Sequence, residues 1–256
     1  MMTGNFPQKA NIVTAFGALS SKEDSIPHQL SLENKTPYFS GDPVLLNYFP
    51  QHLISETHVE AFDIRNDHVD DVTHHYIKKK IRNKDFDFLL AHLLRIDHMG
   101  HAYGLTSQAI PDAIADVDKL IIEIITMIDD DTMLIFGGDH GMTVGGNHGG
   151  DSLQETNMAI VAYYKRGLMK CKHKNEEIKK VMRSVNDANN QILQADLVPT
   201  LSMLLGIPIP FSTMGQILND LYPVGSIDEE NHHQNCPDSN FEVQMLNDNH
   251  LNTLQS

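Results

Sequence analysis

The sequence predicts an α/β fold built on parallel strands, because two apolar runs are separated by an amphipathic segment. The run at 86–94, FDFLLAHLL, has the length and the near-continuous apolar character of a central strand that is covered on both faces. Apolar residues between 110 and 128 recur at steps of three and four, which predicts a helix. The run at 132–136 predicts a second strand. This order is typical of a right-handed parallel βαβ unit, in which both strands end at the same edge of the sheet.

Three further segments are expected to continue the fold. Residues 158–164 predict another strand, and the stretch 176–192 predicts a helix after a lysine-rich loop. A second helix is expected over 195–205, with Gly206 as its C-terminal cap.

The composition indicates one acidic globular domain. Of 256 residues, 41% are hydrophobic and 21% are charged, which is typical of a packed protein. The formal net charge of -15 argues against electrostatic binding to nucleic acid phosphates. No stretch has the roughly 18 uninterrupted apolar residues of a transmembrane helix. We expect one domain over 1–227, followed by a polar, exposed tail over 228–256.

Carboxylate and imidazole side chains follow both predicted strands. Asp97 and His101 come after the first strand, Asp139 and His140 come after the second, and His148 lies nearby among glycines. Both kinds of side chain are ligands of Zn²⁺, and glycines let a loop fold tightly around a small centre. We therefore predict that the first pair binds one metal ion together with His148, and that the second pair belongs to a second metal site.

The prediction of a metal site depends on these pairs occurring together, since a single Asp-His pair at a strand end is usually a hydrogen-bonded loop feature. Histidine-rich donors favour zinc, although manganese accepts the same donors. Two metal ions typically serve in-line displacement at phosphorus, because both the attacking and the leaving oxygen need charge stabilisation. The residues thus predict phosphoryl chemistry and leave open whether the acceptor is water or an alcohol.

These motifs resemble the dispersed metal-binding segments of the alkaline phosphatase superfamily, and most closely those of the GPI ethanolamine phosphate transferases. The matching segments are DHMGHAYG at 97–104, GDHGMT at 138–143, GNHGGDS at 146–152, LVPTL at 197–201 and LLGIPIPF at 204–211. Weaker upstream matches are Thr3-Gly4 with Pro7, Glu23-Asp24-Ser25, Gln29-Leu30, Gly41-Asp42 and Phe49-Pro50. Pro43 and Arg95 depart from the family pattern, which usually has an acidic and a small residue at these positions.

The resemblance implies an alkaline-phosphatase-like fold with a mostly parallel central sheet and helices on both faces. It also implies two zinc ions and a nucleophilic threonine. In the implied reaction the threonine takes ethanolamine phosphate from phosphatidylethanolamine, and a mannose hydroxyl of the GPI glycolipid then accepts it. The NHGGDS and LVPTLSMLLG segments most resemble the type 3 enzymes, which modify the third mannose.

By the same resemblance, the threonine, another metal-binding aspartate and the first strand precede Thr3-Gly4, and transmembrane helices follow residue 228. We therefore expect a truncated luminal domain in which the N-terminal strand and the nucleophile segment are missing. Such a chain would hold at most one complete metal site and would be inactive alone. The family implies a location at the luminal face of the endoplasmic reticulum membrane and a small membrane-protein partner subunit.

Two other functions stay open. A soluble metal-dependent phosphodiesterase or phosphomutase of the same superfamily would use water or a sugar phosphate as the acceptor. A non-catalytic zinc-binding remnant would keep the fold and one metal ion without a nucleophile.

Overall fold

A computed structural model describes the chain in six stretches. These are residues 2–5, 23–49, 51–57, 59–168, 182–183 and 191–222. The chain divides into two compact units. The first comprises Met1–Val13, Ser21–Asn34 and Tyr163–Ser256, and the second comprises Thr14–Ser20 and Lys35–Ala162. All five predicted metal ligands belong to the second unit.

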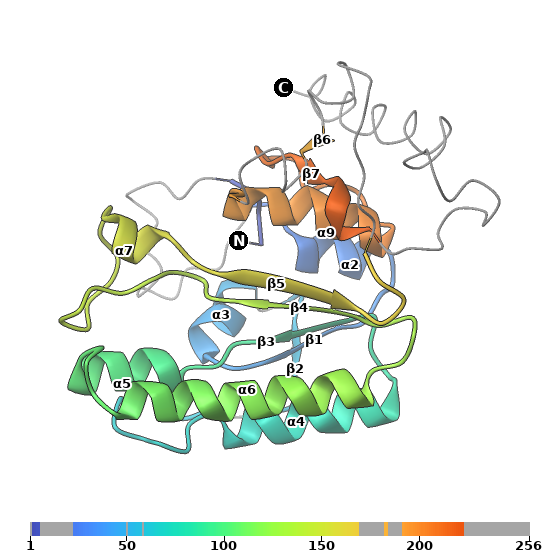
Figure 1. Ribbon diagram of the computed structural model, residues 1–256. Helices are drawn as coiled ribbons and strands as arrows, with labels where there is room; N and C mark the ends of the chain where they lie inside the picture. The colour runs from blue at the N-terminus through green and yellow to red at the C-terminus, as the bar shows by residue number, and fades with distance from the viewer. Residues whose placement is uncertain are drawn as a thin grey trace. The chain divides into compact units, whose positions relative to one another are not determined.

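A three-stranded parallel sheet lies in the second unit (Figure 1). It consists of β1 (Pro37–Ser40), β2 (Ile54–Ser55) and β3 (Phe88–Ala91), in the order β2-β1-β3. Phe39, in the middle strand, is fully buried. The strand predicted over 86–94 is confirmed as β3, and it is shorter than predicted at both ends.

The predicted strand-helix-strand unit is present, but its two strands are not directly paired in the part of the chain that the structure describes. Helix α6 (Ala109–Met127) connects β3 to β4 (Met133–Gly137), and β4 pairs with β5 (Ile160–Tyr164). The apolar pattern determines which faces of a strand are buried, but it does not determine which edges pair. The α/β class, with parallel strands and covering helices, is confirmed.

Three helices lie together on one side of these strands (Figure 1). Helix α4 (Asp71–Asn83) packs against β1, β3 and α6, and α5 (Arg95–Tyr103) packs against α6. Met99 of α5 shares a buried cluster with Ile110 and Ala113 of α6. The apolar stripe predicted over 110–128 therefore contributes core packing.

Two short helices complete the second unit, namely α3 (Pro43–Tyr48) and α7 (Leu153–Thr156). Asp42 caps α3, because its carboxylate accepts a hydrogen bond of 2.8 Å from the backbone N–H of Val44. Pro43 occupies the first helical position, where its ring favours the helical backbone. The proline that departs from the family pattern thus suits its local structure.

The first unit contains short elements. They are α2 (Ile26–Leu32), β6 (Met182–Arg183), the 3₁₀ helix η1 (Gln194–Asp196), α9 (Leu197–Leu205), β7 (Ile217–Leu218) and the 3₁₀ helix η2 (Asn219–Leu221). The helix predicted over 195–205 is confirmed, and Gly206 ends it in the left-handed conformation with φ of 64°.

The helix predicted over 176–192 is wrong at Met182–Arg183, because these residues form a parallel strand that pairs with β7. Pairing with a distant segment overrides the local helical spacing at this point. Residues 176–181 and 184–190 of the expected helix lie outside the described residues. So does the expected tail at 228–256. Among the residues that are described, no helix combines the length and the apolar character needed to cross a membrane.

Candidate metal centre

Two of the predicted ligands lie on α5, which directly follows the C-terminal end of β3. Asp97 and His101 are four residues apart, and this spacing places them on the same face of the helix. The sequence predicts these residues only as a segment after a strand, because polar residues and Gly100 interrupt the apolar spacing that would indicate a helix. Gly104 ends the helix with φ of 75°, a conformation that glycine adopts readily.

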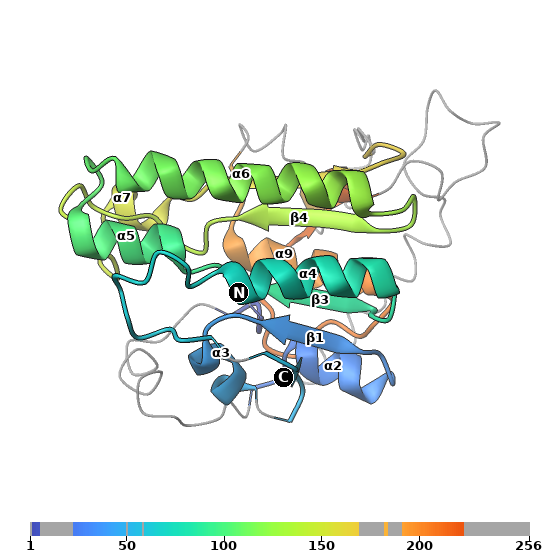
Figure 2. The same ribbon diagram turned by 90° about the horizontal axis from the view of Figure 1, so that it is seen from below.

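The segment after β4 carries the other three predicted ligands. Asp139 and His140 begin it and His148 lies near its end; in Figure 2, β4 points toward the end of the strands at which α5 and α7 lie. Thr143 closes the segment on itself, because its hydroxyl donates to the Asn147 carbonyl at 3.0 Å and accepts from the Asn147 N–H at 3.1 Å. This turn fixes the path of the chain between the two histidines.

Asp97 lies between two imidazoles. Its Oδ2 is 3.3 Å from Nε2 of His101, and its Oδ1 is 3.3 Å from Nε2 of His148. The ring of His148 also stacks on that of His140, with centroids 3.9 Å apart. One donor atom each of Asp97, His140 and His148 lies within 4.8 Å of the others, a spacing at which they could hold one metal ion.

Asp139 forms a second carboxylate-imidazole group beside the first. Its Oδ2 lies 3.6 Å from Nε2 of His140 and 3.6 Å from Nε2 of His92. Burial disfavours the charged form of Asp139, but the adjacent imidazole of His92 and the charges of both histidines lower its pKa to about 2. Asp139 is therefore ionised at neutral pH, which is the form that binds a cation.

The donor atoms fit a divalent cation. Asp97 Oδ1 is buried and accepts no hydrogen bond, a costly state that a bound cation would relieve. His140 Nδ1 lies 3.0 Å from the Gly141 carbonyl; a proton on Nδ1 is donated there, which leaves the Nε2 lone pair for a metal. Burial lowers the pKa of His148, and the charges of His140 and His101 lower it further, against the opposing effect of Asp97. His148 thus favours the neutral form that ligates metals.

The structure brings all five predicted residues into one neighbourhood, and the two expected sets adjoin each other. His140, expected in the second set, stacks on His148 of the first set. Sequence reasoning missed His92, whose imidazole lies against Asp139. The only signal for this residue is a single histidine at the end of an apolar strand.

Comparisons with known proteins agree on one group of relatives. The chain is 34% identical over 235 residues to GPI ethanolamine phosphate transferase 3 of Eremothecium gossypii, an alignment that covers 86% of this chain and 22% of the relative. It is 32% identical over 227 residues to GPI ethanolamine phosphate transferase 3 of Saccharomyces cerevisiae, an alignment that covers 86% of this chain and 22% of that relative. It is 35% identical over 210 residues to GPI ethanolamine phosphate transferase 2 of Kluyveromyces lactis, and this alignment covers 78% of this chain and 26% of that relative.

The chain thus spans about a quarter or less of the length of these relatives. Residues 1–203 match the model of a single family, and this stretch contains every residue of the candidate metal centre. Because the match covers well over half of the 256 residues, the chain belongs to the type I phosphodiesterase / nucleotide pyrophosphatase family.

Proposed function

We propose that this chain is part of a GPI ethanolamine phosphate transferase that moves ethanolamine phosphate from phosphatidylethanolamine to the third mannose of the GPI glycolipid. The observation that carries the proposal is the joint position of Asp97, His140 and His148, whose donor atoms lie within 4.8 Å of one another. This cluster occurs in a chain whose relatives are named GPI ethanolamine phosphate transferases of types 2 and 3.

Zinc is the cofactor that we propose for this centre. Asp97, His101 and His148 would hold one ion, and Asp139 and His140 would contribute to a second ion that adjoins it, since a donor atom of His140 also lies within 4.8 Å of donor atoms of Asp97 and His148. Bound zinc lowers the pKa of a coordinated hydroxyl and neutralises charge that develops on phosphoryl oxygens. His92 would orient Asp139, because its Nε2 lies 3.6 Å from the carboxylate.

The residues of the chain supply a fixed set of charges around the reacting phosphate. Asp97 presents one oxygen toward each of two imidazoles, so its carboxylate plane is held from both sides. Asp139 remains ionised at neutral pH because its pKa is about 2. The ionised carboxylate of Asp139, together with the imidazole of His148, whose lowered pKa favours the neutral form, keeps donors available for cations at neutral pH.

The remaining parts of the proposal follow the relatives. The substrates would be phosphatidylethanolamine and a GPI intermediate, and the site would act at the luminal face of the endoplasmic reticulum membrane. A small membrane-protein subunit would accompany the enzyme.

A chimera tests the transferase proposal, because the relatives are several times longer than this chain. The matching segment of the Saccharomyces cerevisiae type 3 enzyme is replaced by this chain, and GPI intermediates are analysed by mass spectrometry in cells that lack the native enzyme. We expect ethanolamine phosphate on the third mannose, and its loss in Asp97→Asn and His148→Ala. Asp118→Asn, the same chemical change at an exposed position of α6, should retain activity. A folded chimera that leaves the third mannose bare would contradict the proposal.

The family match favours one second candidate, a hydrolase that cleaves phosphodiesters with water. An assay of the purified chain with zinc and bis(4-nitrophenyl) phosphate distinguishes the hydrolase from the transferase. Turnover that Asp97→Asn abolishes would favour the hydrolase.

A further inference from the structure

We propose that Asp70 is a positioning residue for the candidate metal centre, because its carboxylate holds the first turn of the helix that carries Asp97 and His101. The inference rests on the proposed metal centre and adds a residue outside it. Asp70 immediately precedes α4 and lies 27 positions before Asp97 in the chain.

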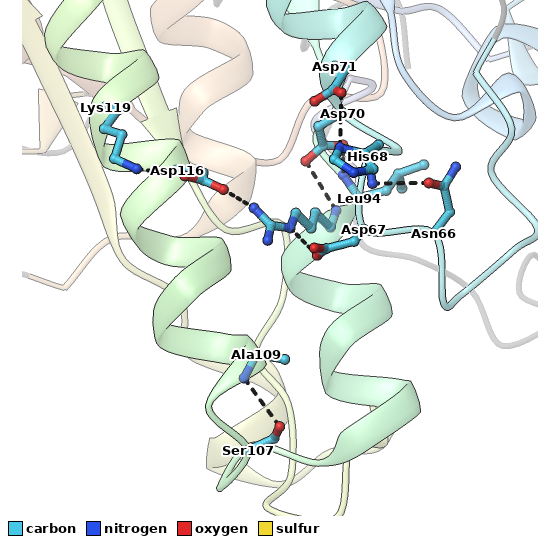
Figure 3. A network of polar contacts seen from close by, with 11 residues as sticks. Asn66, Asp67, His68, Asp70, Asp71, Leu94, Ser107, Ala109, Asp116 and Lys119 are labelled. Carbon is cyan, nitrogen blue, oxygen red and sulfur yellow. Dashed lines mark hydrogen bonds and ion pairs between the residues drawn. The ribbon is translucent and has the colours of Figure 1, made fainter.

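The carboxylate of Asp70 caps α5 rather than its own helix. Its Oδ1 accepts a hydrogen bond of 2.7 Å from the backbone N–H of Leu94, and its Oδ2 accepts one of 3.2 Å from the N–H of Arg95. Leu94 is the N-cap position of α5 and has no side chain that can accept these hydrogens. Asp70 makes no side-chain cap bond to α4. Both carboxylate oxygens therefore serve the start of α5 (Figure 3).

Burial makes this contact rigid. Asp70 is only 3% exposed, so water competes little for its oxygens. The neighbouring Val69 shares a buried apolar cluster with Leu94, Val59 and Ala61. The start of α5 is thus held by hydrogen bonds to its backbone and by apolar packing of the N-cap residue Leu94.

The side chain of Arg95 adds a second connection at this turn. Its Nε donates to Asp67 Oδ1 at 2.7 Å, and its guanidinium also donates to Asp116 of α6. Asp116 in turn accepts from Lys119 at 2.9 Å (Figure 3). These carboxylates raise the pKa of Arg95 against the effect of its burial, so the link stays charged.

The Asp70 cap should affect the positions of two candidate metal ligands. Asp97 lies two residues after Arg95, in the same first turn, and His101 lies one turn further on. A shift or fraying of this turn would move both Asp97 oxygens relative to His148, which lies on a separate segment of the chain. Loss of the cap should therefore weaken metal binding in a protein that remains folded.

The test compares Asp70→Asn and Asp70→Ala with Asp71→Asn in the full 256-residue chain. Asp71 is the adjacent aspartate, and its side chain is 69% exposed. Zn²⁺ affinity is measured by calorimetry well below the melting temperature, and ligand geometry is followed by the visible absorption of bound Co²⁺. Since outer contacts of metal ligands typically change affinity by 10–100-fold, we expect a loss of about tenfold in Asp70→Asn with an altered Co²⁺ spectrum. Asp71→Asn should match the unmodified chain.

The outcomes separate the inference from the proposed metal centre. If the unmodified chain binds neither ion, the metal centre fails and the role of Asp70 fails with it. If the unmodified chain binds and Asp70→Asn keeps its affinity and spectrum, only the role of Asp70 is overturned, even when the melting temperature falls. Should Asp70→Ala not fold, Asp70→Asn decides, because it retains one of the two acceptor oxygens.

Discussion

At the scale of the residue, Gly146 lets the histidine loop approach α5 closely. Its φ of 81° lies in the left-handed region, and a Cβ at this position would collide with the backbone carbonyl oxygen of Gly100. Its N–H donates to the Thr143 carbonyl at 2.9 Å, within the turn that precedes His148. The lack of a side chain at Gly146 is therefore one reason that His148 can lie beside α5.

Replacing Gly146 should affect both stability and metal binding. In Gly146→Ala the left-handed backbone and the collision together should lower the free energy of unfolding by about 2–4 kcal/mol. The displaced loop should also weaken Zn²⁺ binding. Urea unfolding and calorimetry measure the two effects.

Gly206→Ala is the control for Gly146→Ala. Gly206 has a φ of 64°, and within the described residues no atom beyond its chain neighbours and its own helix lies within 4 Å of the place where its Cβ would be. It should lose only about 1 kcal/mol of stability, with unchanged metal affinity. Equal losses in the two variants would show that the close approach to Gly100 has no energetic effect.

The sequence predicts which residues lie at the site better than it predicts how these residues are shared between two metal ions. Asp97, Asp139 and His148 could be found because each belongs to a short motif that follows a strand. The stack of His140 on His148 could not be predicted, since it depends on the path of the intervening turn. His92 was missed because a single histidine in an apolar strand usually has no functional role.

At the scale of the element, a buried lysine holds α4 on the sheet. Lys80 is 1% exposed, and its ammonium lies 3.2 Å from the ring centroid of Tyr38 on β1. It also donates to Asp85 at 3.2 Å and to Glu56 at 3.4 Å. Burial lowers the pKa of Lys80, but the hydrogen bond to Asp85 and the adjacent Tyr38 outweigh this effect, so the pKa lies above its usual value. Lys80 therefore remains charged inside the fold.

Lys80→Met should lower the free energy of unfolding by about 2 kcal/mol, because a desolvated cation-π contact is lost. Methionine keeps the chain length, and the carboxylates of Asp85 and Glu56 can still be hydrated, since both are more than 40% exposed. Thermal and urea unfolding measure the change.

The adjacent Lys79→Met provides a matched comparison for Lys80→Met. Lys79 is 51% exposed and makes a surface ion pair of 3.6 Å with Glu56. Loss of this ion pair should lower the free energy of unfolding by less than about 0.5 kcal/mol. A Lys80→Met variant as stable as Lys79→Met would contradict the role assigned to the buried ammonium.

Elements with a sustained apolar period were predictable, whereas α5 was not. The periodic stripe over 110–128 corresponds to α6, and the apolar runs correspond to β3 and β4. Helix α5 has polar residues at its centre and takes its N-terminal cap from Asp70, a residue of another element. The residues of α5 and their spacing therefore cannot predict this cap. The strand at Met182–Arg183 was missed for the same reason, because its partner is β7.

At the scale of the whole molecule, the candidate donors are unevenly distributed. Every one of them lies in the unit that contains Lys35–Ala162, while α9 and β7 belong to the other unit. A bound metal should therefore stabilise one unit directly. The net charge of -15 also gives the chain as a whole an attraction for cations.

Metal binding should protect backbone amides unequally. With free Zn²⁺ at about a thousand times its dissociation constant, the metal-bound unit should gain about 4 kcal/mol of stability. Hydrogen exchange measured by mass spectrometry should slow in β3, α5 and β4, with little change in α9. Adding EDTA should reverse the effect. Equal slowing in both units would contradict a stabilisation confined to one of them.

The order of these donors along the polypeptide has a consequence for biosynthesis. Asp97 comes first and His148 last among the candidate ligands, so all of them precede Tyr163, where the chain returns to its other unit. On a translating ribosome, these candidate ligands leave the exit tunnel before the C-terminal part of the chain is made. Metal loading can therefore accompany translation, and the metal supply in the compartment that receives the nascent chain would then influence how its first part matures.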